Sequence, residues 1–184
     1  MNAPTAIPPA PNPGAESAFD LYEASVPVFV QALENLAHLL RKAEAQAQSQ
    51  ALAPAEFIEA RLAPDMFNLA RQVQSAADAA KICIARLAGQ KPPSDPDTET
   101  TFDELQARIA KTLAFIRSVD PALVASAITR VIDVPLPTGA RQFTGRSYLL
   151  KFCLPNFFFH VTTAYGILRH KGVAIGKLDY LGAF

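Results

Sequence analysis

Residues 146–171 have the sequence RSYLLKFCLPNFFFHVTTAYGILRHK, which is long, mostly apolar and ends in three basic residues before Gly172. Cations complement the dipole at the carboxyl end of a helix, and glycine there is the usual stop. The stretch therefore predicts a helix over about Arg146–Lys171, bent in mid-course by Pro155. Because apolar side chains nearly encircle it, we expect it to be the most buried helix or to share a face with a second subunit.

Three more helices are predicted upstream from apolar residues that recur at helical spacing. The first spans about Asp20–Gln48, and the second starts near Pro64 and ends before Gly89. The third begins after Thr101, which has a glutamate three residues later, as in a capping box, and it ends near Ser118. Together with the last helix they predict an all-α fold, a four-helix bundle.

The connections between these helices have different compositions. Pro54 can open a short helical turn, Ala55–Arg61, between the first two helices. Gln90–Thr100 is rich in proline and acidic residues, which predicts an exposed crossover. Before the last helix, Val131–Phe143 alternates around the turn Pro137-Thr138-Gly139, which predicts a small hairpin or irregular ribbon outside the bundle.

Length and composition indicate one domain. The chain has 184 residues, half of them apolar, so residues 19–184 can build a single core. Residues 1–18 are rich in proline and alanine and lack an apolar run, which predicts a disordered leader and not a signal peptide.

Charge and cysteine content favour a location in the cytoplasm. The 17 basic residues equal the 17 acidic ones, so we expect no nucleic-acid partner. The longest apolar stretch is interrupted by polar residues, so we expect no membrane association. Cys83 and Cys153 fall inside helical patterns, which indicates buried free thiols in a reducing compartment.

Sequence motifs for catalysis are few. The chain has no glycine-rich phosphate loop, paired-cysteine motif or nucleophile elbow. Helical projection places a group of polar residues, including Cys153, on one side of the last helix, while the second helix carries one acid on its apolar stripe and one amide at its margin. These positions predict a ligand pocket between the second and last helices, with the candidate residues Asp65, Gln72, Asn156, His160 and Thr163.

Each of these residues also has a purely structural interpretation. His160 can be a core histidine hydrogen-bonded to a neighbouring helix. Asp65 can be an acid that favours the first turn beside Pro64. His38 and His170 lie on unsuitable faces for a three-histidine zinc site, so we expect no metal.

Three segments resemble a known family. They are Leu21–Phe29 (LYEASVPVF), Arg61–Gln74 (RLAPDMFNLARQVQ) and Pro155–Tyr165 (PNFFFHVTTAY). Over about residues 19–182 the chain is similar to a bacterial domain-of-unknown-function family within the DinB-like superfamily. The resemblance implies a four-helix bundle that is often dimeric.

The wider superfamily includes metal-dependent thiol transferases and maleylpyruvate isomerases. Their metal is held by one histidine on the second helix and a His-x-x-x-His pair on the fourth. In this chain His160 matches the first histidine of the pair, whereas Ala164 takes the place of the second and Gln72 that of the helix-two ligand. The resemblance therefore does not carry the metal chemistry over.

The sequence leads to one main hypothesis and two alternatives. The main hypothesis is a DinB-like protein that binds a small molecule without a metal, or a divergent enzyme, through the predicted pocket. The first alternative is a metal-dependent transferase with one divalent ion, manganese or magnesium, held by His160, Gln72 and Asp65. The second is a structural or regulatory homodimer, with the aromatic side of the last helix as the interface.

Overall fold

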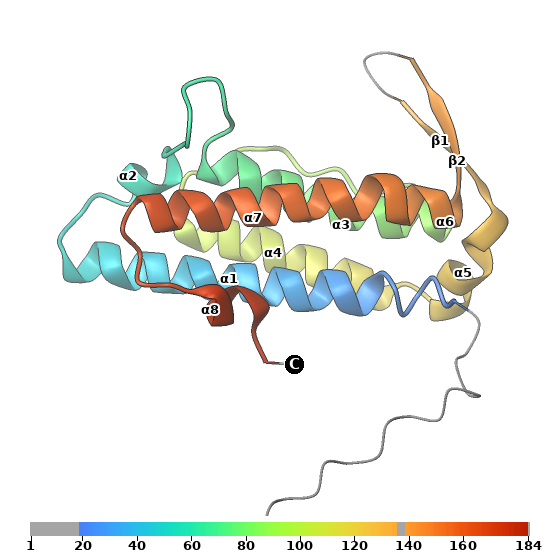
Figure 1. Cartoon of the computed structure of the whole chain (residues 1–184), viewed down its shortest axis with the longest axis horizontal. Coiled ribbons are helices and arrows are strands. Elements are labelled where there is room, and N and C mark those ends of the chain that lie inside the picture. Colours follow the sequence, from blue (N-terminus) through green and yellow to red (C-terminus); the bar gives the residue numbers. More distant parts are fainter. Residues whose placement is uncertain (1–18, 136–138, 184) are drawn as a thin grey trace, which may run out of the picture.

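The computed structural model describes residues 19–135 and 139–183, and its long helices form the predicted bundle (Figure 1). The leader 1–18 and residues Pro137 and Thr138 of the predicted turn fall outside this range. A short helix precedes the second long helix, as expected. The elements of the bundle are α1 (Val26–Ser49), α2 (Ala55–Ile58), α3 (Leu69–Leu87), α4 (Phe102–Ser118) and α7 (Leu154–His170).

Two helices begin later than the sequence pattern predicts. Helix α1 begins at Val26 and not at Asp20. Pro27 has no N–H to donate and is accepted only in the first turn of a helix, so a helix that contains it begins just before it. Helix α3 begins at Leu69 and not near Pro64. The side chain of Asn68 caps it by accepting a hydrogen bond from the Arg71 amide at 2.9 Å.

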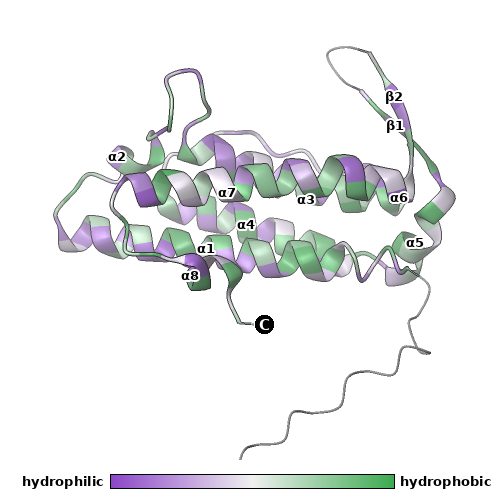
Figure 2. Ribbon diagram, viewed as in Figure 1, coloured by the Kyte–Doolittle hydropathy of each residue, from purple (hydrophilic) through white to green (hydrophobic). Residues whose placement is uncertain are grey.

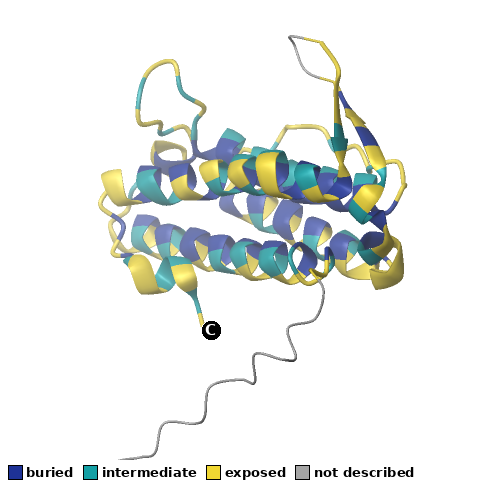
Figure 3. Ribbon diagram, turned by 45° about the vertical axis from the view of Figure 1, so that its right-hand side comes forward, coloured by how far each residue is buried: buried dark blue, intermediate teal, exposed yellow. Residues whose placement is uncertain are grey.

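Helix α3 is the most buried element of the bundle. Buried residues lie where the long helices face one another (Figure 3), while hydrophobic and hydrophilic residues alternate along each helix (Figure 2). Fully buried Ala76 and Ala80 let α4 and α7 pack closely on α3. The first alternative for the last helix, that it is the most buried, is wrong, because α7 leaves side chains such as Phe159 exposed to solvent; the second, a face shared with another subunit, stays a prediction.

The crossover Gln90–Thr100 is held against the bundle by its acidic side chains. Asp95 lies 2.5 Å from buried Lys81 of α3, and Glu99 lies 2.9 Å from buried Arg108 of α4. Most residues of the crossover are exposed, as expected, but the Asp95 side chain is only 7% exposed. The acidic side chains of the crossover pair with Lys81 and Arg108, whose positive charges would be costly to bury without a partner.

Between α4 and the last helix the chain forms a short helix, a 3₁₀ turn and a hairpin, of which the sequence predicted only the hairpin. Helix α5 (Pro121–Ala125) and a 3₁₀ turn, Ser126–Thr129, were not predicted. The antiparallel hairpin of β1 (Val131–Val134) and β2 (Arg141–Thr144) confirms the expected ribbon, and it projects from one end of the bundle (Figure 1).

The last helix has three parts, which accommodate its proline. Helix α6 (Gly145–Tyr148) continues into a π-helical turn, Leu149–Cys153, and then into α7. Pro155 has no N–H to donate and its ring crowds the carbonyl four residues earlier, so the wider turn before it relieves that clash.

After α7 the chain turns back along the bundle. Helix α8 (Lys177–Leu181) packs on α1, where Asp179 pairs with Lys42 at 2.8 Å. Tyr180 also covers part of α7 by bonding Thr162 at 2.9 Å.

No single described helix combines the length and apolar character needed to cross a membrane. By length and composition alone, the pair Phe102–Ser118 and Pro121–Thr129, bent by 81°, meets the test together.

Candidate functional site

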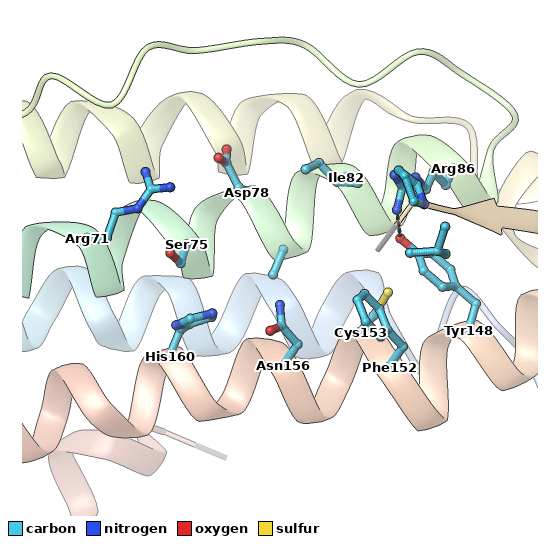
Figure 4. A pocket seen from close by; sticks show the side chains of 13 residues that line it. Arg71, Ser75, Asp78, Ile82, Arg86, Tyr148, Phe152, Cys153, Asn156 and His160 are labelled. Carbon is cyan, nitrogen blue, oxygen red and sulfur yellow. Dashed lines mark hydrogen bonds between the residues drawn. The ribbon is translucent and has the colours of Figure 1, made fainter. Parts of the chain in front are cut away.

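A cleft of about 310 Å³ lies between α3 and the last helix, with the hairpin at one end (Figure 4). We call it the α3–α7 cleft. Its lining combines polar and apolar side chains from three parts of the chain. The residues are Arg71, Ser75, Asp78, Ala79, Ile82 and Arg86 of α3, Val134 and Pro135 of the hairpin, and Tyr148, Phe152, Cys153, Asn156 and His160 of the last helix.

The two walls face each other along nearly their whole length. On α3, residues 71, 75, 78, 82 and 86 recur every three or four positions and therefore share one side of the helix. Opposite them, Tyr148, Asn156 and His160 follow one another along the last helix (Figure 4). The π-helical turn lies within this second wall and contributes Phe152 and Cys153.

His160 is oriented by a residue behind the wall. Its Nδ1 lies 2.8 Å from Oε1 of Gln72, which is 1% exposed. The amide nitrogen of Gln72 donates to the Phe67 carbonyl at 3.4 Å, so its oxygen is turned toward the ring. Because an amide oxygen only accepts, Nδ1 carries the proton, and Nε2 of the neutral ring is left as an acceptor.

The surroundings of His160 favour this neutral form. Burial lowers the pKa of His160, and the positive charge of Arg71 lowers it further. At neutral pH the imidazole is therefore an uncharged hydrogen-bonding group, able to accept a proton or a hydrogen bond through Nε2.

At the other end of the cleft Arg86 is held by an aromatic ring. Its Nη1 donates to Tyr148 Oη at 3.0 Å, and its Cζ lies 5.8 Å from the centre of the same ring. Burial raises the pKa of Tyr148, so the phenol stays neutral and does not compensate the charge of the guanidinium.

The two cysteines lie beside this arginine–tyrosine pair. Both are free and buried, which confirms the predicted thiols. Burial and the neighbouring Cys153 raise the pKa of the Cys83 thiol well above its ordinary value. The thiolate form is thereby disfavoured, and Cys83 is a poor nucleophile.

The other charged residues of the cleft are neutralised by protein partners. Asp78 lies 2.9 Å from both Lys81 and Arg108, and in Figure 4 its carboxylate points away from the last helix. Arg71 pairs with Asp97 of the crossover. Within residues 19–135 and 139–183, Arg86 forms no ion pair.

The structure brings some of the predicted pocket residues together and separates others. His160 and Asn156 line the cleft, and Gln72 contacts His160 from behind. Asp65 was expected on the apolar stripe of the second helix, and this is wrong: α3 begins at Leu69, which leaves Asp65 exposed in the preceding turn. Thr163 is buried, but its hydroxyl donates to the Phe159 carbonyl of its own helix at 2.7 Å and does not line the cleft.

Most residues of the α3 wall are not among the predicted pocket residues. The predicted residues of this helix lay on its apolar stripe or, in the case of Gln72, at the margin of that stripe, whereas Arg71, Ser75 and Arg86 lie on its polar side. Their spacing along one side was visible in the sequence. Nothing local indicated that this side would face the last helix and not solvent.

The arrangement required for a rebuilt metal site is not formed. Asp65 is exposed and does not line the cleft with His160, and Ala164 offers no ligand atom. Among the described residues no three His, Cys, Asp or Glu side chains converge.

Comparison with known proteins agrees with this fold. The family model for a domain of unknown function, DUF1993, matches residues 21–181. The crystal structure of a DinB family member protein from Shewanella denitrificans is similar to the chain, with 44% sequence identity and a TM-score of 0.83. The match covers 89% of this chain and 93% of that one.

The remaining comparison is negative, since no curated protein matches the chain significantly. The family match nevertheless covers every long helix of the bundle, from α1 to α7, and confirms the resemblance noted in the sequence. The chain belongs to the DUF1993 family of DinB-like helical bundles.

Proposed function

We propose that this protein binds a small organic molecule, without a metal ion, in the α3–α7 cleft. The observation that carries the proposal is the neutral His160, whose Nδ1 is bonded to Gln72 and whose Nε2 is left as an acceptor in the wall of the cleft. A buried partner that fixes the ring while leaving one nitrogen available is typical of a binding site.

The dimensions and the lining support the same function. About 310 Å³ is at the lower end of the range for small-ligand pockets. Ile82, Phe152 and Val134 give the cleft apolar surface, and polar side chains such as Asn156 and His160 give it about as much hydrogen-bonding surface, so the lining suits a ligand with both characters. Asn156 adds both donors and an acceptor beside His160.

Binding is better supported than covalent catalysis. A nucleophilic hydroxyl needs a base within hydrogen-bond reach, and in the part of the chain that the structure describes no hydroxyl bonds His160. Thr163 is committed to its own backbone, and the Cys83 thiol is disfavoured as a thiolate.

A library of metabolites tests the proposal through thermal shift. Ile82 lines the cleft and is half-buried, so Ile82→Trp fills the space with an indole. Ala107 is exposed on α4, and Ala107→Trp is the matched control. A compound that raises the Tm of the wild type and of Ala107→Trp, but not of Ile82→Trp, is the expected result. Compounds that raise the Tm of all three proteins equally would contradict binding in the cleft.

A further inference from the structure

We infer that the ligand of the α3–α7 cleft is a monocarboxylate with an apolar body, whose carboxylate pairs with Arg86. This inference rests on the proposed function and adds to it the charge and the orientation of the ligand.

The first argument is charge balance inside the cleft. Three charged side chains line it, namely Arg71, Asp78 and Arg86. Asp78 and Arg71 already have partners of opposite charge, whereas Arg86 has none within residues 19–135 and 139–183. One unmatched positive charge in a half-buried position is complemented by one negative charge on the ligand.

The second argument is that Arg86 is already oriented. The bond to Tyr148 Oη uses one of its five N–H groups, and no other described residue accepts a hydrogen bond from it. The guanidinium also lies over the Tyr148 ring. A fixed planar fork with free donors matches the two oxygens of a carboxylate and loses little side-chain entropy on binding.

The third argument concerns the rest of the ligand. In Figure 4 Ile82 lies next to Arg86 on α3 and Phe152 lies on the facing helix between Tyr148 and Asn156, while His160 lies farthest along the cleft. The apolar side chains suit a hydrocarbon or aromatic segment next to the carboxylate. At the far end the last helix offers neutral hydrogen-bonding groups, and the charge of Arg71 on α3 is already paired with Asp97, so an uncharged hydroxyl or amide fits there.

The experiment compares acids with their neutral amides. The probes are 4-phenylbutyrate and octanoate, with 4-phenylbutyramide and octanamide as isosteric controls and phenyl phosphate as a different anion. Binding is followed by titration of the ¹³C-methyl NMR signal of Ile82, which lines the cleft. We expect each acid to bind at least tenfold more tightly than its amide and more tightly than phenyl phosphate.

Variants of Arg86, with a matched variant of Arg41, test whether acid binding depends on the positive charge in the cleft or on the net charge of the protein. Arg86→Gln keeps a donor for Tyr148, so acid affinity should fall about tenfold to that of the amide while amide affinity stays unchanged. Arg86→Lys keeps the charge but loses the fork and should give an intermediate loss. Arg41, exposed on α1, supplies the control Arg41→Gln, which alters the net charge equally and should leave both affinities unchanged.

Three results would overturn the inference, and they differ in what they imply for the proposed function. Equal affinity of acids and amides, with the Ile82 signal shifted, removes the role of Arg86 but keeps binding in the cleft. Tighter binding of phenyl phosphate replaces the carboxylate by a phosphate. If none of the probes shifts the Ile82 signal but a metabolite from the library does, only the ligand class is wrong. If neither a probe nor a metabolite shifts the Ile82 signal, the proposed function fails as well.

Discussion

Gln72 determines which nitrogen of His160 is available to a ligand. The two side chains are 88 positions apart in the sequence and 2.8 Å apart in the structure. The Gln72 amide nitrogen donates to the Phe67 carbonyl, which fixes the direction of its oxygen. The backbone before α3 therefore determines the orientation of the imidazole on α7. Gln72 is buried whereas His160 is half-buried, so removing the imidazole is costly because the Gln72 oxygen loses its partner without regaining water.

A double-mutant cycle on this pair is the first prediction. His160→Leu should lower the free energy of unfolding by about 1–3 kcal/mol, because the buried Gln72 oxygen loses its donor. Adding Gln72→Leu should recover much of that loss, since both polar demands are then removed. Urea unfolding of the two single variants and the double variant measures the coupling. Strictly additive effects would contradict the hydrogen bond.

Two glycines of the last helix show how closely the elements around the cleft are packed. A Cβ on Gly145, the first residue of α6, would lie 2.0 Å from the Ala127 carbonyl oxygen in the 3₁₀ turn. A Cβ on Gly166 of α7 would lie 3.5 Å from a methyl group of Leu62, which is an ordinary contact. The first position needs glycine for close approach, and the second does not.

The second prediction uses these glycines as a matched pair. Gly145→Ala should destabilise the fold by about 1–3 kcal/mol, because the new methyl group collides with rigid backbone. Gly166→Ala should stabilise it by about 0.5–1 kcal/mol, since alanine is the better residue inside a helix. Thermal unfolding of both variants is the measurement, and a Gly145→Ala protein as stable as the wild type would be inconsistent with the packing of α6 on the 3₁₀ turn.

The acidic crossover makes the stability of α3 and α4 sensitive to acid. Hydrogen bonds from Lys111 and then Lys81 lower the pKa of Asp95 from 3.8 to about 2. A lowered folded-state pKa stabilises the native state above the unfolded value of 3.8, and this contribution disappears as the pH falls through about 2. The window of the effect is therefore between about pH 4 and pH 2.

The third prediction is that Asp95→Asn removes part of this acid sensitivity. Between about pH 4 and pH 2 the wild type should lose on the order of 2 kcal/mol more than the variant. Denaturant titrations at stepped pH measure the difference. Asp103, exposed in the first turn of α4, provides the control Asp103→Asn. A variant with the same pH profile as the wild type would show that Asp95 does not carry the effect.

At the scale of the whole molecule, the outer side of α7 is only partly covered. Tyr180 of α8 packs edge-on against Tyr165, and Leu62 lies beside Gly166. Phe159 nevertheless remains 57% exposed and Leu62 remains 45% exposed. Large apolar side chains left in water at one place are typical of an interface with another chain.

The fourth prediction is a homodimer through this side of α7. Light scattering at micromolar concentration should give twice the mass of one chain, and Phe159→Ser should shift the population to monomer. Leu123 is 38% exposed on α5, so Leu123→Ser is a control that should leave the dimer intact. A monomeric mass for the wild type would remove the dimer hypothesis.

The helices and their ends were largely accessible to sequence reasoning. The apolar periodicity identified the long helices, and the capping box at Thr101 is present in the structure. The errors at α1 and α3 arose where Pro27 and Asn68 act through local backbone chemistry that a periodic pattern does not register. Helix α5 was not predicted, because a proline such as Pro121 can stop one helix or begin the next, and here it begins a new one.

By itself the sequence determined the four-helix class, the hairpin and the family, because helix periodicity, turn residues and specific segments act over short distances along the chain. The cleft was decided only by the tertiary structure. Arg86 meets Tyr148 across 62 positions, and His160 meets Gln72 across 88. These contacts depend on the π-helical turn, which sets the rotation of the last helix, and on how close the alanines of α3 let it approach. Neither the rotation nor the distance between two helices is encoded in the periodicity of either one, so the side chains that face each other are determined only by packing.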